Sequence, residues 1–265
     1  MKKKSQKVSI IIPVYKPEME ILKKIRNMLK KQTIKSEIIE VWNNPQAVSL
    51  NKGIKKAKGK IVVMLFQDCV PENEYWLEKL IKPLENKEVA VTSSDLYLPE
   101  KYWEKYPFLT KVLTINERVV KRPGGWRACA YRKKDLIKVG MIDEEIKLVT
   151  IDTDLWTKSR KLGKIVHPGV MVNHLHHLTN SKKLALDYYY AELNGKLLEQ
   201  RLLEKDSWKS ILRAIPILGI FPIIYVFPWK KLNKFWYWFF PYLLLSPLSN
   251  LVYVSGFWKG FFFDK

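Results

Sequence analysis

Cysteine and glycine are scarce in this sequence, and each shortage excludes a class of protein. Its two cysteines, Cys69 and Cys129, form neither a zinc-ligand spacing nor a CxxC redox pair. A disulfide-stabilised scaffold is therefore excluded, and the cysteine content fits a reducing compartment. With 11 glycines and 47% hydrophobic residues among 265, the chain is neither low-complexity nor a disordered polycation.

Acidic residues are also few, at 26 against 47 lysines and arginines, which gives a net charge of +21. This excess fits nucleic acid, an anionic membrane surface or a phosphorylated small molecule as partner. Residues 206–265 carry a net +5 and residues 1–205 carry +16. No nucleic-acid motif is present, and the tryptophans and phenylalanines gather in the apolar C-terminal part instead of alternating with basic residues. No nucleic acid is therefore expected as a partner.

Phosphate-binding motifs of the GxGxxG and GxxxxGK[ST] types are absent, so dinucleotide-binding and P-loop assignments have no support. Short apolar runs instead alternate with segments of helical periodicity. Strands are predicted at 8–12, 37–42, 60–65 and 89–93, and helices at 19–31, 47–58 and 73–84. The alternation predicts an α/β domain with a mostly parallel sheet, helices on both faces, and ligands at the carboxyl ends of the strands.

Both ends of the chain have features of targeting or membrane segments. Residues 8–15 imitate a signal peptide, but Pro13, Lys16 and the lack of a small-residue cleavage site favour a first strand and a cytoplasmic domain. Near the other end, 214–229 and 235–258 are uncharged runs of 16 and 24 residues. A spanning helix needs about 20 apolar residues, so a membrane-associated helical hairpin at 206–265 is expected after a domain at 1–205. A bent in-plane segment and a buried hairpin of a soluble protein are the alternatives.

Three segments carry residue types suited to chemistry. Asp68 follows a predicted strand, where a carboxylate can hold a divalent cation against a diphosphate or else cap the next helix. Asp152 and Asp154 open a later helix, and only one of them can face a given cleft because they point about 200° apart. His174 and His176 could reach a metal from one side of a strand, although such histidines are more often hydrogen-bonded or exposed.

In their order along the chain, these segments resemble the family 2 glycosyltransferases, which are nucleotide-sugar enzymes of the GT-A fold. The resemblance covers about residues 7–200. Its motifs are VSIIIPVY at 8–15, SLNKGI at 49–54, FQD at 66–68, GGW at 124–126, VGMIDE at 139–144, ID at 151–152, and Pro168 with His174. The FQD form followed by proline resembles the rhamnosyltransferase-like branch. Phe66 stands where the family has the first Asp of its Asp-x-Asp metal motif.

The resemblance implies an inverting, metal-dependent hexosyltransferase. It would move a sugar from a nucleoside diphosphate sugar to a hydroxyl of a membrane-associated, lipid-linked glycan acceptor, with Mg²⁺ or Mn²⁺ as cofactor. Asp152 is implied as catalytic base, and Asp68 and His174 as metal ligands. The residues implied in nucleotide-sugar binding are Pro13, Tyr15, Lys16, Asn43, Asn51, Gln67 and Asp68, and those implied on the acceptor side are Gly125, Trp126 and Asp154. The enzyme would lie at the cell membrane, with its basic domain against anionic lipid on the cytoplasmic face.

Two other functions fit the same features. A polyprenyl-phosphate glycosyltransferase would share the fold and the hairpin, but its acceptor phosphate is already ionised and needs no general base. Dependence on Asp152 would therefore argue against it. A non-catalytic basic pseudo-enzyme that binds membranes is compatible with Phe66 at the metal motif, and a lack of metal-dependent nucleotide binding would favour it.

Overall fold

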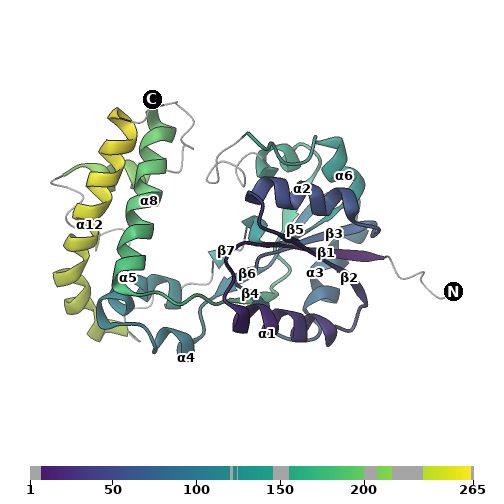
Figure 1. Cartoon of the computed structure of the whole chain (residues 1–265), viewed down its shortest axis with the longest axis horizontal. Helices are drawn as coiled ribbons and strands as arrows, with labels where there is room; N and C mark the ends of the chain where they lie inside the picture. The colour runs from purple at the N-terminus through teal and green to yellow at the C-terminus, as the bar shows by residue number, and fades with distance from the viewer. Residues whose placement is uncertain are drawn as a thin grey trace. The chain divides into compact units, whose positions relative to one another are not determined.

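The computed structural model describes residues 7–119, 122–123, 125–145, 155–199, 208–216 and 235–263. Packing divides the chain into two compact units (Figure 1). The first comprises residues 1–99 and 121–176, and the second comprises residues 100–120 and 177–265. The first unit contains the sheets, and the second is built from helices.

Strands and helices alternate along the first unit, as the apolar pattern predicts. Its elements are β1 Val8–Val14, α1 Met19–Lys30, β2 Ser36–Trp42, α2 Gln46–Lys56, β3 Ile61–Leu65, β4 Cys69–Pro71, α3 Trp76–Ile81, η1 Lys82–Glu85, β5 Val89–Ser93, β6 Asp95–Tyr97, β7 Arg122–Pro123, η2 Gly125–Arg127, β8 Ala128–Arg132, α6 Lys133–Lys138, β9 Lys164–Val166 and β10 Met171–His174. The helix expected at 73–84 is shorter, because β4 and a turn precede it and a 3-10 turn with Pro83 ends it.

A six-stranded sheet, in the order β2-β1-β3-β8-β5-β9, forms the centre of the described part of this unit. β1 is parallel to β2 and β3, and β5 is parallel to β9, whereas β8 is antiparallel to both of its neighbours. Helices α1 and α3 lie on one face and α2 and α6 on the other (Figure 1). Because helices cover both faces, all residues of β1, β3 and β5 are buried. The predicted α/β fold with a mostly parallel sheet is confirmed.

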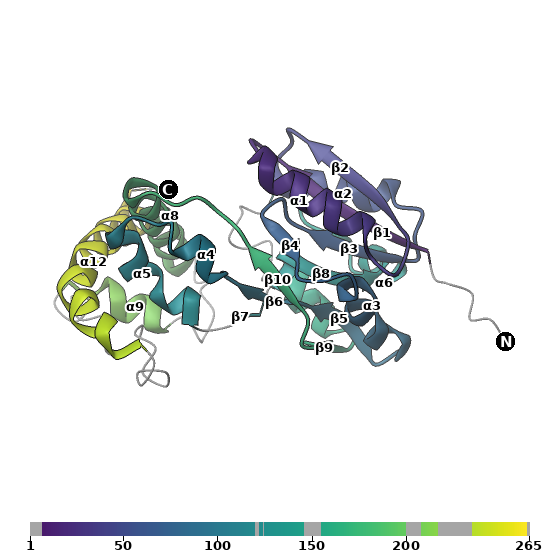
Figure 2. The ribbon, with the colours of Figure 1, turned by 90° about the horizontal axis from the view of Figure 1, so that it is seen from below.

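A second sheet of four short strands, in the order β4-β10-β6-β7, lies beside the central sheet (Figure 2). In this sheet β10 is antiparallel to β4, and the register sets His174 opposite Cys69. The sequence pattern did not predict this sheet, because strands of two to four residues are too short to show a period. Its effect is to bring residues 69 and 174 together.

The second unit is a group of helices. Its described elements are α4 Glu100–Trp103, α5 Phe108–Val119, α8 Asn180–Glu199, α9 Trp208–Ala214, η6 Trp236–Trp238 and α12 Phe239–Phe262. α8 and α12 lie side by side (Figure 1). Contacts advance in the same direction along both, from Asp187 with Ser249 to Gly195 with Phe257, so the two helices run parallel.

A membrane-spanning form of the hairpin expected at 206–265 is not supported. Within the described ranges, no helix combines the length and the apolar character needed to cross a bilayer. The run 235–258 forms η6 and most of α12, which contains Pro247 and buries serine and asparagine side chains. Most of the run 214–229 lies outside the described residues, as do residues 200–207 around the expected domain boundary.

Candidate active site

A cavity of about 510 Å³ opens where β1, β2 and β3 end. Its walls come from the segments that follow these three strands. The lining residues are Pro13, Val14, Tyr15, Asn43, Asn44, Pro45, Gln46, Phe66, Gln67 and Asp68. In parallel α/β sheets, ligands bind at this edge of the strands. Of the residues predicted to bind a nucleotide sugar, the cavity brings together Pro13, Tyr15, Asn43, Gln67 and Asp68.

Hydrogen bonds fix the loops of this cavity to one another. The backbone N–H of Tyr15 donates to Oε1 of Gln67 at 2.8 Å, and Nε2 of Gln67 donates to the Tyr15 carbonyl at 2.8 Å. The backbone N–H of Asn43 donates to the Val14 carbonyl at 2.9 Å, and Asn43 has a φ of 55°. Asparagine tolerates this left-handed conformation better than most residues. The loop after β1 is therefore joined to the loop after β3 by the side-chain amide of Gln67. It is joined to the loop after β2 by a backbone hydrogen bond.

The amino end of α2 also lies at the cavity. Gln46, the first residue of this 11-residue helix, lines it, and Pro45 stands immediately before the helix. The first N–H groups of a helix have no partner within the helix and carry partial positive charge, which favours an anionic ligand. The cavity therefore offers a polar, phosphate-compatible wall beside the loop amides of Asn43 and Asn44.

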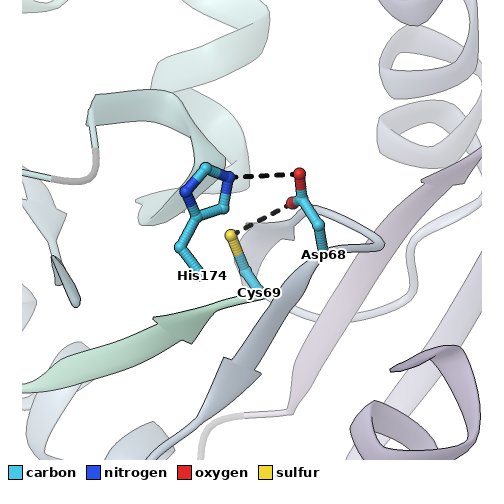
Figure 3. Close-up of side chains that lie close together, drawn as sticks. All are labelled: Asp68, Cys69 and His174. Carbon is cyan, nitrogen blue, oxygen red and sulfur yellow. Dashed lines mark hydrogen bonds and ion pairs between the residues drawn. The ribbon is translucent and has the colours of Figure 1, made fainter. Parts of the chain in front are cut away.

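Asp68, which lines this cavity, lies against His174 (Figure 3). Nε2 of His174 lies 3.2 Å from Oδ2 of Asp68, and Sγ of Cys69 donates to Oδ1 of Asp68 at 3.4 Å. The backbone N–H of Leu175 also donates to the Asp68 carbonyl, at 2.7 Å. These contacts extend the β4–β10 pairing by one residue and fix the carboxylate in place.

The surroundings of Asp68 keep it ionised. Burial by itself would raise its pKa, but the positive charges of His174 and Arg127 and the hydrogen bonds from His174 and Cys69 outweigh burial. The pKa is lowered to about 2. The side chain retains 35% exposure, so the carboxylate is still open to the cavity.

Asp68, Cys69 and His174 form a group with the donor types of a metal site. Their ligand atoms all lie within 4.8 Å of one another. Burial, and secondarily the nearby Asp68 charge, raises the pKa of the Cys69 thiol well above its usual range, so the thiol stays protonated. The carboxylate and the imidazole therefore fit a divalent cation better than the thiol does.

Phe66 stands where the Asp-x-Asp motif has its first Asp, and its side chain makes an aromatic contact there. Its ring meets the ring of Trp126 edge-on, with centroids 4.7 Å apart, and the two residues are almost fully buried. The backbone N–H of Phe66 also donates to the Arg127 carbonyl at 2.9 Å. Trp126, expected on the acceptor side, thus packs against Phe66, which lines the cavity, and directly precedes the arginine whose charge acts on Asp68.

The other predicted site residues lie away from the cavity lining or outside the described residues. Lys16 follows the cavity loop with a φ of 43°, and its ammonium lies over the Tyr15 ring. Asn51 does not line the cavity. It is buried, and its amide bonds the backbone of Ile142 on both its nitrogen and its oxygen. Gly125 begins the short helix η2, while Asp152 and Asp154 lie outside the described residues.

The structure adds Pro45 and Gln46, which the sequence did not single out, to the lining of the cavity beside Asn44. Lys52 of α2 donates to Oδ1 of Asn44. The positions of Pro45 and Gln46 follow from the short connection between β2 and α2. Cys69 joins the Asp68 group through a pairing with β10, and no local sequence signal marks that pairing.

Residues 20–140 match the sequence model of glycosyl transferase family 2. The matched segment runs from α1 to α6 and contains Asp68, while the β1 loop and His174 lie outside it. No curated protein matches the chain.

Two solved structures are similar to the chain. One is the mannosyltransferase PcManGT from Pyrobaculum calidifontis in complex with GDP-Man and Mn²⁺, at 12% identity and a TM-score of 0.60 over 98% of this chain and 88% of that one. Another is GalNAc-T7 with UDP, GalNAc and Mn²⁺, at 13% identity and a TM-score of 0.48 over 76% of this chain and 52% of that one. The likeness to PcManGT shows a shared fold, and the family model matches 121 of the chain's 265 residues.

Proposed function

We propose that this protein is an inverting glycosyltransferase that takes a sugar from a nucleoside diphosphate sugar. The observation that carries the proposal is the pair Asp68 and His174 beside the cavity at the strand ends, within a fold and a sequence segment of family 2 type. PcManGT, which shares the fold, holds GDP-Man and Mn²⁺, and this supports the same ligand class here.

The cavity suits the nucleotide part of such a donor. Its lining offers the amides of Asn43, Asn44 and Gln46 as donors and acceptors, together with the amino end of α2. The Tyr15–Gln67 bonds hold two of its walls in place before a ligand arrives, which limits the ordering that binding requires. Pro13 and Tyr15 add an apolar contact surface beside the amides.

Asp68 and His174 would hold a divalent cation, Mg²⁺ or Mn²⁺, and Asp68 is ionised at all ordinary pH values. A bound cation neutralises the diphosphate as negative charge develops on the leaving group. Phe66 cannot contribute a ligand, so this chain has one carboxylate where the Asp-x-Asp pattern would have two. We therefore expect weaker cation binding than a pair of carboxylates would give.

Asp152 would act as the general base. It would accept the proton of an acceptor hydroxyl while that oxygen bonds to the anomeric carbon and the nucleoside diphosphate leaves, which inverts the configuration. Gly125, Trp126 and Asp154 are proposed for the acceptor side, Trp126 through its packing against Phe66 because its own side chain is buried. A lipid-linked glycan at the cytoplasmic face of the cell membrane is the proposed acceptor, because the net charge of +21 suits anionic lipid. Membership of the rhamnosyltransferase-like branch is proposed from the FQD motif alone.

The Asp152→Asn variant tests the proposal. We expect it to lower acceptor-independent hydrolysis of the preferred nucleotide sugar by about 10²- to 10⁴-fold, while the affinity for that sugar stays within about threefold. Glu88→Gln, an exposed carboxylate paired with Lys164, is the control and should hydrolyse the donor as the wild type does. Near-normal hydrolysis by Asp152→Asn would refute the role of this residue.

A further inference from the structure

The long helix α12 of the second unit has its polar and apolar sides exchanged relative to an ordinary surface helix. A helix on a water-exposed domain buries an apolar stripe and presents polar residues to solvent. In α12 the buried residues are Tyr242, Ser246, Ser249, Asn250, Tyr253, Gly256, Phe257 and Gly260. Most of this inner face is hydroxyl, amide or glycine.

Large apolar side chains lie on the outer face at helical spacing. The exposed fractions are 62% for Phe240, 75% for Leu244, 47% for Leu248 and 59% for Leu251. Intervals of four, four and three residues place these side chains on one side of the helix. These four residues are called the outer stripe. A contiguous exposed apolar surface of this kind marks a binding surface.

The inner face pairs its polar groups within the unit. Ser249 Oγ donates to Oδ2 of Asp187 on α8 at 2.7 Å, and Nε of Arg213 on α9 donates to Oδ1 of Asn250 at 3.1 Å. The Asp187 carboxylate also forms an ion pair with Nζ of Lys183 at 2.6 Å. Helices in apolar surroundings need such internal pairing, because no water is available to satisfy their polar groups.

Glycines bring α12 close to α8. A Cβ on Gly260 would lie 1.9 Å from the Glu192 carbonyl oxygen, and one on Gly195 would lie 2.0 Å from the Phe257 carbonyl oxygen. Gly256 and Gly260 have the GxxxG spacing. Close approach through small residues replaces apolar side-chain burial where the surroundings themselves are apolar.

The ends of α12 and its charge also point to lipid. Trp236 and Tyr237 are exposed before the outer stripe, and Phe262 and Phe263 are exposed after it. Aromatic residues at both ends of an apolar stretch are typical of the membrane interface. The helix contains no acidic residue, and its charged residue is Lys259, which suits anionic headgroups.

We propose that the outer stripe of α12 inserts among the acyl chains of one membrane leaflet, with the helix axis in the plane of the interface. The inference deepens the proposed function, on which it rests for the membrane-held acceptor, by naming the surface that meets the lipid. Lipid fits better than a second copy of the chain, because a protein partner would cover the stripe but would not account for the polar inner face. An apolar stripe on one side of a helix suits insertion from the surface.

An environment-sensitive fluorophore tests the position of the stripe. It is attached to Leu244→Cys in the full chain, and to Ile137→Cys on α6 as a control, since Ile137 is 56% exposed. Cys69 and Cys129 are buried, so they do not compete for the label. With vesicles of phosphatidylcholine and phosphatidylglycerol, we expect blue-shifted emission at 244 and unchanged emission at 137. Water-like emission at 244, with or without bound vesicles, would overturn the inference.

A polar variant tests whether the stripe drives binding. Leu244→Gln, Leu248→Gln and Leu251→Gln combined should lower partitioning onto these vesicles by about tenfold or more, because binding scales with buried apolar area. Met19→Gln with Ile137→Gln, two exposed apolar residues of the first unit, should partition as the wild type does. Equal partitioning of the stripe variant, with loss of a dimer in sedimentation equilibrium, would instead make the stripe a contact between copies.

Calorimetry separates this inference from the proposed function. GDP and UDP are titrated with Mn²⁺ into the wild type and the stripe variant, and both should bind nucleotide equally. If neither protein binds nucleotide while the stripe variant still loses lipid, the proposed function fails and the lipid surface stands. If nucleotide binds and the stripe variant keeps its lipid, only the lipid surface is refuted.

Discussion

Nε2 of His174 lies 3.2 Å from Oδ2 of Asp68, although 106 positions separate the two residues in the chain. The antiparallel pairing of β10 with β4 produces this contact, because it sets His174 opposite Cys69. The pair stands at a cavity formed by the loops after β1, β2 and β3. A carboxylate and an imidazole are thereby positioned together where parallel α/β sheets bind their ligands.

Removing the imidazole should weaken cation binding and change the acidity of Asp68. In His174→Ala, we expect Mn²⁺ affinity to fall by about 10- to 100-fold, by analogy with the loss of groups that support a metal site. The Asp68 pKa, lowered to about 2 partly by His174, should rise. Calorimetry and carboxyl NMR measure the two effects. His167→Ala, at a histidine outside the Asp68 group, is the control and should change neither quantity.

The free energy of unfolding should depend on pH because the pKa of Asp68 is lowered in the folded state. A carboxyl whose pKa is lower in the folded state stabilises the protein above its unfolded pKa of about 3.9 and loses that contribution as pH falls toward the folded pKa. For Asp68 the loss should occur between about pH 4 and the folded value of about 2. We expect the stability difference between wild type and Asp68→Asn, measured by denaturant unfolding with a chelator present, to shrink across this range. A difference that grows as pH falls would show that the pair does not stabilise the folded state.

Asn51 should matter for stability more than for binding. Its buried amide bonds the Ile142 backbone at 2.7 Å and 3.2 Å, and it also donates to Glu144 at 2.9 Å. Asn51→Ala would leave buried backbone groups of Ile142 unpaired, which costs about 1–3 kcal/mol. We expect that loss in urea unfolding, with nucleotide affinity preserved. Asn86→Ala, at an exposed position, is the control and should lower the free energy of unfolding little. A large loss of nucleotide affinity in Asn51→Ala would instead show that Asn51 belongs to the nucleotide site.

Close packing of α8 and α12 should tolerate no added methyl group. Gly260→Ala would place a carbon 1.9 Å from the Glu192 carbonyl oxygen, so the two helices would have to separate. Overpacking of this kind costs about 1–3 kcal/mol. Thermal unfolding should show the loss in Gly260→Ala and not in Ser255→Ala, which changes an exposed position of the same helix. Equal stability of the two variants would mean that the helices do not approach this closely.

The sequence predicted the central fold well, because strands β1, β3 and β5 are continuous apolar runs and α1 has a clear helical period. It also indicated the cavity, since Tyr15, Asn43 and Gln67 each follow one of the predicted strands. The antiparallel insertion of β8 was missed, because an apolar run does not show the direction of its neighbours.

The other features that the sequence did not predict arise from long-range pairing and from the C-terminal helices. No local pattern links Cys69 to β10, so the thiol was not expected beside Asp68. Asn51 reads locally like a ligand-binding residue, yet its partner Ile142 lies 91 positions away. The 235–258 run has the length of a spanning segment. Its serines and its asparagine lie on one face, however, and a count of apolar residues does not detect such a face.

The most direct test of the central claim is calorimetry of GDP and UDP with the wild type and Asp68→Asn, each with and without Mn²⁺. The account predicts that one nucleotide binds the wild type in a Mn²⁺-dependent way. Asp68→Asn should lose that dependence, with affinity reduced by about 100-fold, while Glu88→Gln behaves as the wild type. Nucleotide binding that is absent, or that is unchanged by both Mn²⁺ and Asp68→Asn, would contradict a metal-assisted glycosyltransferase site at Asp68.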